Sequence, residues 1–181
     1  MLALQAAAYP PAFHEARATF AALLALYPAG CLGIFATDEP RRRLCGYAFA
    51  HPAHCSAVPP SLHSDDHDWS SGSAHGTSAL HYCFYVHDVA VDPVSRGRGL
   101  ATSLLQALAG TAAHPVLMLT AVLGAARFWE RFGFKLVADL DAAALARLET
   151  YPGALTPSAA VPRPVVMAAQ AAAVLAALHL R

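Results

Sequence analysis

The stretch of sequence that decides the fold reads Val89-Ala-Val-Asp-Pro-Val-Ser-Arg-Gly-Arg-Gly-Leu-Ala101. An apolar strand runs into a turn broken by Gly97 and Gly99, and an amphipathic helix follows at once. Glycine allows positive φ and close backbone approach, and the first N–H groups of a helix have no partner inside it. With Arg96 and Arg98 beside the positive end of the helix dipole, such a turn binds anions, and we expect a pyrophosphate. The alternative is a tight strand-to-helix turn without a ligand.

The spacing of this turn excludes two common nucleotide-binding loops. It contains neither G-x-x-x-x-G-K-[ST] nor a complete G-x-G-x-x-G. Residues 96–101 instead fit [QR]-x-x-G-x-[GA], and a later segment reads Ala125-Ala-Arg-Phe-Trp-Glu-Arg-Phe-Gly-Phe134. The first pattern resembles the acyl-coenzyme-A signature of the GNAT superfamily of N-acetyltransferases, and the second resembles that family's A-x-x-F-Y-x-x-x-G-F helix and turn.

The resemblance implies that acetyl-coenzyme A is the co-substrate and that its binding residues lie in three segments. The backbone of the central strand would pair with the pantetheine arm and donate an N–H to the reacting carbonyl oxygen. The turn would hold the phosphates, and the aromatic pair of the second signature would lie near the thioester. The residues carried over are Val89, Ala90, Val91, Arg96, Gly97, Arg98, Gly99, Leu100, Ala101, Thr102, Phe128 and Trp129.

His87 is the candidate general base, because an imidazole titrates near neutral pH. The segment His87-Asp-Val-Ala-Val91 resembles the His-x-Leu-Ala-Val of the arylalkylamine (serotonin) N-acetyltransferase branch, in which the histidine is catalytic. Strand alternation predicts that Tyr85, His87 and Val89 share one face. The alternative for His87 is a histidine satisfied by local hydrogen bonds.

The general acid is less clearly marked. The family's tyrosine position holds Trp129, whose indole N–H donates a hydrogen bond but does not ionise usefully. Trp129 can line the pocket or pack in the core. The alternatives for the acid are Tyr85, Tyr82 or a water molecule. Tyr85 also occupies the position of that branch's second histidine, which leaves a two-histidine relay in doubt.

Four aromatic side chains are candidates for the acceptor site, where they would suit an aryl or hydrophobic amine with cation–π help. The alternative for all four is ordinary core packing. They are Tyr9, Phe13, Tyr27 and Phe49.

The composition fits one globular domain over residues 1–181, with 56% hydrophobic and 13% charged residues. The net charge of +0 argues against nucleic acid as a partner. We expect no membrane span and no signal peptide, and therefore a soluble cytoplasmic protein. Residues 51–78 are rich in His, Asp, Ser and Pro, and we expect a long surface loop there. Their histidines lack the spacing of a structural zinc site, so no metal is expected.

Strand and helix patterns alternate, which predicts an α/β architecture. The resemblance implies the GNAT fold, a mixed and mostly antiparallel sheet flanked by helices, although the strand that usually opens the family's domains is missing here. Residues 165–178 form a strand or a helix that periodicity does not resolve. The expected helices are 12–26, 100–108, 125–131 and 141–149, and the expected strands are 31–36, 44–50, 79–91, 115–121 and 134–138.

We expect an N-acetyltransferase that moves an acetyl group from acetyl-coenzyme A to the primary amine of a small, aromatic or hydrophobic acceptor by direct attack. The oligomeric state is open between monomer and homodimer. Two other functions remain open: a peptide or protein N-acetyltransferase, and a non-catalytic module that binds acyl-coenzyme A.

Overall fold

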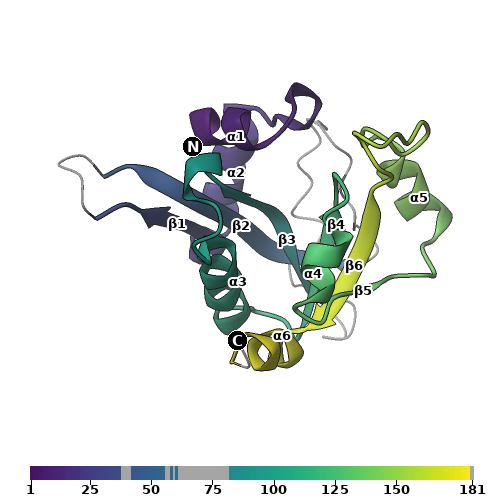
Figure 1. The fold of residues 1–181 in the computed structure, drawn as a ribbon. Coiled ribbons are helices and arrows are strands. Elements are labelled where there is room, and N and C mark those ends of the chain that lie inside the picture. Colours follow the sequence, from purple (N-terminus) through teal and green to yellow (C-terminus); the bar gives the residue numbers. More distant parts are fainter. Residues whose placement is uncertain (38–41, 56–57, 59, 61–81, 180–181) are drawn as a thin grey trace.

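A computed structural model describes residues 1–37, 42–55, 58, 60 and 82–179 of the chain (Figure 1). Within these residues six strands form one sheet in the order β1-β2-β3-β4-β6-β5. Strands β3 and β4 are parallel, and every other neighbouring pair is antiparallel. The strands are β1 (Cys31–Phe35), β2 (Leu44–His54), β3 (Tyr82–Val91), β4 (Val116–Ala121), β5 (Lys135–Leu136) and β6 (Val165–Gln170).

Helices cover both faces of the sheet (Figure 1). On one face, leucines of α3 and Val174 of α6 pack against alternate residues of β2, β3, β4 and β6. On the other face, Leu4 of α1 and Phe20 and Leu23 of α2 pack against Tyr47 and Phe49 of β2. The helices are α1 (Leu2–Ala8), α2 (Arg17–Leu26), α3 (Leu100–Gly110), α4 (Ala126–Glu130), α5 (Ala142–Leu148) and α6 (Ala171–His179). The mixed, mostly antiparallel sheet between helices confirms the predicted fold class.

The predicted helix over residues 12–26 is shorter than expected, because its first turn is not α-helical. Pro11–Phe13 forms a 3₁₀ turn, and α2 begins only at Arg17, after Ala16 with an extended ψ of 155°. Phe13 is buried as the spacing suggested, with 7% of its surface exposed. The extended residues between Pro11–Phe13 and α2 include Glu15, which lines the candidate site described below.

The segment 165–178 contains both of the structures between which its pattern did not decide. Strand β6 pairs with β4 and β5 and is followed directly by α6, with no loop between them. The segment is apolar apart from Gln170, because β6 packs on both of its faces and α6 packs against the core on one side. Residues 1–30, all of which are described, contain helical turns but no strand ahead of β1.

Strand β2 is longer than predicted and runs to His54, so the first residues assigned to the loop 51–78 belong to the sheet. His51 pairs with Tyr85 and is 2% exposed. Residues 56–57, 59 and 61–78 of the predicted loop lie outside the described residues. No helix in the described part of the chain is both long and apolar enough to cross a membrane.

Candidate active site

A cavity of about 770 Å³ opens where β3 and β4 part. The two strands pair only from Phe84 to Val86 with Leu117 to Leu119, and beyond these residues their edges separate. The volume is in the range of small-molecule sites. The polar and charged residues on its wall are Tyr9, Glu15, Tyr85, His87, Asp88, Arg96, Thr102, Thr120, Arg131 and Tyr151.

A β-bulge at His87 changes which side chains of β3 face the helices. Phe49 of β2 pairs with Asp88 and the next residue, Ala50, pairs with Val86, so His87 is the extra residue. A bulge shifts the alternation of side chains by one residue. Val89 therefore packs against the core beneath α3, whereas Tyr85 lies in the core on the opposite face.

The prediction that Tyr85, His87 and Val89 share one face is therefore wrong for Val89. The ring of His87 lies 6.2 Å from that of Tyr85 between centroids, so these two residues do lie together. The bulge also brings Asp88 to their side of the sheet, where it meets Tyr9 and Tyr47.

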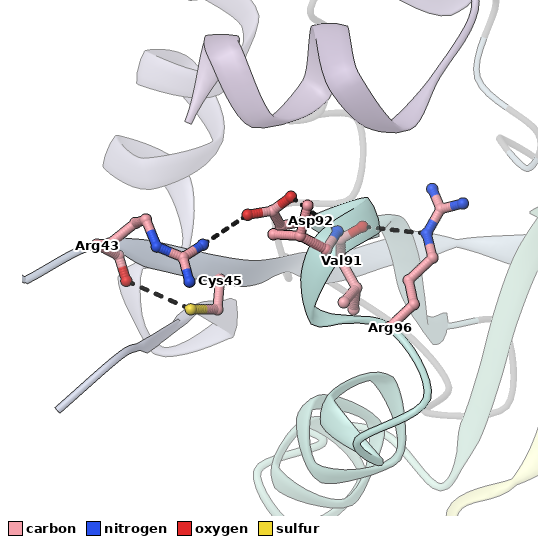
Figure 2. A network of polar contacts seen from close by, with 6 residues as sticks. Arg43, Cys45, Val91, Asp92 and Arg96 are labelled. Carbon is pink, nitrogen blue, oxygen red and sulfur yellow. Dashed lines mark hydrogen bonds and ion pairs between the residues drawn. The ribbon is translucent and has the colours of Figure 1, made fainter. Parts of the chain in front are cut away.

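The carbonyl groups on the cavity edge of β3 are held by side chains. Asp92 donates its N–H to Cys45 of β2 at 2.9 Å, so the backbone groups of Val89 and Val91 point the other way, toward the cavity. The Val89 carbonyl accepts from the Tyr9 hydroxyl at 2.8 Å, and the Val91 carbonyl accepts from Arg96 Nε at 3.4 Å (Figure 2). The N–H groups of Val89 and Val91 thus face the gap and are suited to pair with an extended ligand.

The predicted anion turn has the backbone geometry that its glycines suggested. Gly97 and Gly99 both have φ of 76°, and a Cβ at either position would meet nothing within 4 Å. Gly99 is the N-cap of α3, so the N–H groups of the first helical turn open toward solvent without side-chain caps. This turn lines the same cavity as His87. Of its two arginines, Arg96 lines the cavity and Arg98 does not.

An ion pair fixes the chain just before this turn. Arg43 Nη1 lies 2.6 Å from Asp92 Oδ2, and the other carboxylate oxygen of Asp92 accepts the N–H of Val94 at 3.3 Å (Figure 2). Asp92 thereby caps the 3₁₀ turn Pro93–Ser95 that carries the chain from β3 to the glycines.

His87 is paired with a carboxylate that sequence analysis did not identify. Its Nε2 lies 3.3 Å from Oε1 of Glu15, with the two side chains 6% and 15% exposed. On the other side, His51 of β2 lies 6.1 Å away between ring centroids. Burial, followed by the charge of His87, lowers the pKa of His51 to about 4. A second histidine is therefore next to His87, but it comes from the neighbouring strand.

Asp88 is held by two tyrosine hydroxyl groups. Tyr9 Oη lies 2.7 Å from Oδ1, and Tyr47 Oη lies 2.7 Å from Oδ2. Burial raises the pKa of the Asp88 carboxyl, and the two tyrosine hydrogen bonds oppose this effect only in part. Burial and the neighbouring Asp88 also raise the pKa of both tyrosines, so the phenols are neutral hydrogen-bond donors.

Tyr85 lies deep in the cavity beside two other hydroxyl groups. Its Oη is 2.9 Å from Thr120 Oγ1, and Tyr151 interacts with the same pair. Burial is the main cause that raises the pKa of Tyr85, and it raises the pKa of Tyr151 to about 12. A neutral phenol can donate a proton to a thiolate, so the geometry leaves both tyrosines as candidate acids. Tyr82, the other tyrosine considered, stacks on His114 and does not line the cavity.

The aromatic pair of α4 lies on the cavity wall and also touches the core. Phe128 and Trp129 pack edge to face at 5.1 Å, and Trp129 meets Phe134 at 5.6 Å. The connection before α4 includes Leu123, whose φ of 53° is unusual for a residue with a Cβ. Leu123 lines the cavity, so this strained backbone lies at the site.

Two of the four predicted acceptor aromatics line the cavity and two do not. Tyr9 and Phe13 are on its wall. Phe49 packs against Phe20 at 5.1 Å beneath α2, and Tyr27 packs against Phe84 at 5.7 Å on the other face of the sheet. The latter two are core residues, because β2 and the end of α2 direct them into the two apolar layers.

The cavity wall also contains four polar residues that were not predicted from the sequence: Glu15, Asp88, Thr120 and Tyr151. Asp88 had a signal, since a carboxylate next to a candidate base in a strand is unusual. Glu15 and Tyr151 lie in irregular segments, where no periodicity reports the direction of a side chain. Among the described residues, no three His, Cys, Asp or Glu side chains form a group that could hold a metal ion.

The family model described as the acetyltransferase (GNAT) family matches residues 3–134. None of the curated proteins compared matches the chain significantly. Among solved structures, the chain is similar to the loading GNATL domain of CurA from Lyngbya majuscula, with 13% identity, a TM-score of 0.61, and coverage of 94% of this chain and 90% of that domain.

Two further structures have a similar fold. The NatC complex bound to Gag peptide and CoA has 11% identity and a TM-score of 0.60, covering 92% of this chain and 85% of that one. Naa20 from Chaetomium thermophilum, in complex with a bisubstrate analogue, has 16% identity and a TM-score of 0.56, covering 93% and 81%. At such identities the likeness shows the fold alone.

Proposed function

The chain belongs to the GNAT family of acetyltransferases, and we propose that it transfers an acetyl group from acetyl-coenzyme A to the primary amine of a small acceptor. One observation carries the proposal. The cavity joins an open anion turn, Gly97–Gly99, to the bulged His87 along the free edge of β3, so a phosphate site and a base lie on one continuous wall.

The coenzyme end of the cavity fits an extended pyrophosphate ligand. The glycines leave room for phosphate oxygens against the backbone, and the first N–H groups of α3 point there. Val89 and Val91 direct their N–H groups into the gap, where an amide-containing arm can pair like a further strand. Leu100, Ala101 and Thr102 line the same end, and Phe128 and Trp129 form an apolar wall.

The reaction is direct attack of an amine on a thioester, for which the bound coenzyme supplies the acetyl group and a thiolate leaving group. The acceptor arrives as an ammonium ion and must lose a proton, which His87 accepts. The amine nitrogen then forms a bond to the carbonyl carbon, and the carbon–sulfur bond breaks. Backbone N–H groups of β3 stabilise the developing oxyanion, and Tyr85 or Tyr151 donates a proton to the departing thiolate. The attacking nitrogen loses its second proton as the carbon–sulfur bond breaks, and that proton restores the tyrosine.

The aromatic wall residues Tyr9 and Phe13 favour a small hydrophobic or aryl amine over a long peptide. The NatC complex and its bound Gag peptide show that the same fold also accommodates peptides. A protein N-acetyltransferase therefore remains the second candidate, and its substrates belong in any test.

The experiment measures thiol release from acetyl-coenzyme A with a panel of aryl and alkyl amines and peptides with free N-termini, for the protein and for His87→Ala. We expect release with small amines, and a turnover number about 10²–10⁴-fold lower in the variant at nearly unchanged coenzyme affinity. Release with peptides alone would identify the second candidate. Coenzyme binding without release for any acceptor would instead indicate a non-catalytic binding module.

A further inference from the structure

Glu15 lies on the cavity wall beside His87, in a short extended segment between two helical turns. The segment His14–Ala16 is neither 3₁₀ nor α-helical, and it lies between Pro11–Phe13 and α2. His14 Nε2 lies 2.8 Å from the carbonyl oxygen of Tyr9, so the segment is tied back to the end of α1. This connection directs the Glu15 carboxylate to His87 at 3.3 Å.

The charges on the cavity wall are distributed unevenly. The basic residues among the described lining residues are Arg96, next to the glycine turn, and Arg131, whose guanidinium lies 4.9 Å from the Phe128 ring of α4. The acidic ones are Glu15 and Asp88, on either side of His87. Both oxygens of Asp88 accept tyrosine hydroxyl groups at 2.7 Å, so Asp88 is used within the protein.

The charge of Glu15 reaches several groups at this end of the cavity. It contributes to the raised pKa of Asp88, of Tyr47 and of Tyr151, which come from β3, β2 and the segment after α5. All three effects have the sign of a negative charge held close to the groups. A cation that binds beside Glu15, within reach of His87, would be attracted by this negative charge.

We propose that Glu15 determines specificity by binding the ammonium form of the acceptor amine and presenting it to His87. This inference rests on the proposed function and adds the charge state of the acceptor that the site selects. The ammonium ion takes the place of His87 Nε2 as a partner of the Glu15 carboxylate. One of its N–H groups donates to Glu15, and a second donates to the unprotonated Nε2 of His87, which takes that proton before attack. Amines that are cationic at neutral pH are then preferred over neutral amines of the same shape.

The test compares alkylamines with O-alkylhydroxylamines of equal chain length, which carry a primary NH₂ group but are neutral at pH 7. Kinetics are measured for the protein, for Glu15→Gln and for Glu149→Gln, an exposed glutamate at the end of α5 that serves as the matched control. For alkylamines we expect Glu15→Gln to raise KM about 10- to 100-fold, the scale of a charge-assisted hydrogen bond. For O-alkylhydroxylamines we expect a change below about threefold, and Glu149→Gln should change neither.

If Glu15→Gln raises the KM of alkylamines and of O-alkylhydroxylamines by the same factor, the inference is overturned while the proposed function stays intact. No acetylation of either acceptor by the parent protein would instead contradict the proposed function. A second measurement does not depend on turnover. N,N-dimethylalkylamines, which remain cationic, should bind the parent protein in calorimetry and weaken about tenfold or more in Glu15→Gln.

Glu15→Asp keeps the charge on a shorter side chain and should recover part of the alkylamine KM. If Glu15→Gln does not fold, the test uses the parent protein alone and compares its affinity for a cation with its affinity for a neutral molecule. The dimethylalkylamine must then bind more tightly than the neutral hydrocarbon of the same shape, and lose that advantage as salt is raised. Equal binding of cation and hydrocarbon would refute the role of Glu15.

Discussion

Replacement of Asp88 by asparagine should stabilise the protein or leave its stability unchanged at neutral pH, although the residue is half-buried and held between two tyrosines. The reason is that the Tyr9 hydroxyl has fewer hydrogens to donate than it has acceptors nearby. The Tyr9 hydroxyl has one hydrogen but lies 2.7 Å from Asp88 Oδ1 and 2.8 Å from the Val89 carbonyl. With an ionised Asp88, only one of these two acceptors can be satisfied.

A protonated Asp88 resolves the conflict, and asparagine reproduces it. A protonated Oδ1 of Asp88 would donate to Tyr9 Oη, in place of accepting from it, which leaves the Tyr9 hydrogen for the Val89 carbonyl. The other Asp88 oxygen would still accept from Tyr47 at 2.7 Å. An asparagine amide offers the same donor and acceptor without a titrating group. Alanine offers neither, and it leaves the buried Tyr47 hydroxyl without its acceptor.

The pH dependence follows from the raised pKa of Asp88, whose ordinary value is 3.8. A carboxyl pKa that is higher in the folded state means that the folded protein binds more protons between the two pKa values. Stability from this group is therefore complete below the unfolded value and is lost as pH rises through the folded value. The asparagine side chain of Asp88→Asn does not titrate, so its free energy of unfolding should rise relative to that of the parent as pH rises. The total gain is about 1.4 kcal/mol for each unit by which folding raises the pKa of Asp88.

Denaturant unfolding from pH 4.5 to 8.5 measures these differences, with Asp139→Asn as an exposed control. Asp88→Ala should cost about 2–4 kcal/mol, because the Tyr47 hydroxyl loses its partner and one Tyr9 contact disappears. For a chain of this length that corresponds to a fall in Tm of roughly 4–16 °C. Two results would refute the reasoning. One is that Asp88→Asn lowers the free energy of unfolding as much as Asp88→Ala does, and the other is that the parent becomes more stable relative to Asp88→Asn as pH rises.

Two further predictions concern the turn between β3 and α3. Gly99→Asp should weaken acetyl-coenzyme A binding about 100-fold in calorimetry, since it places a negative charge at the anion site. Gly99→Ala adds the same backbone strain at φ 76° without the charge, and its Cβ meets no atom within 4 Å, so it should cost far less affinity; equal losses would point to backbone strain as the cause. Arg43→Ala should cost under about 1 kcal/mol of stability, because the Arg43 side chain is 39% exposed. Asp92→Ala should cost more, since Asp92 also caps the turn at Val94, and a larger effect of Arg43→Ala than of Asp92→Ala in thermal melts would contradict this order.

The parts of the fold that the sequence predicts well are those with a strong local cause. Gly97 and Gly99 adopt the positive φ that their spacing suggested, because other residues there would be strained. The strands and α3 lie within a few residues of their predicted bounds, since apolar alternation and helical spacing reflect which side chains the core accepts. The family resemblance rests on these same segments.

The bulge at His87 could not be predicted, and the arrangement of the candidate catalytic residues depends on it. A one-residue insertion leaves no mark in composition, yet it reverses the alternation from Asp88 onward. Simple alternation placed Val89 beside His87 and left Asp88 on the other side of the sheet. In the observed register Asp88 lies on the side of Tyr9 and Tyr47, and Val89 packs on the opposite face of the sheet. The reason is that β2 pairs with β3 on both sides of the extra residue.

Glu15 shows a second limit of sequence analysis. The helical spacing of Phe13 and Phe20 is real, and both residues are buried. The backbone between them is nevertheless partly extended, since Phe13 and α2 are anchored to the protein separately. A regular helix through residue 15 was the simplest interpretation of that spacing, and it gave no reason to place Glu15 beside His87.

The cavity edge of β3 and the end of α1 are held by the same two side chains. Tyr9 follows α1 directly and binds the Val89 carbonyl, and Arg96 reaches both the Val91 carbonyl and, at 3.5 Å, the carbonyl of Ala8. The Tyr9 bond is short and lies beside the half-buried carboxyl of Asp88, so it fixes the edge. The two Arg96 contacts are long and exposed, so their loss costs little. A phosphate bound at the glycine turn can therefore draw Arg96 away while Tyr9 keeps the Val89 N–H directed into the cavity.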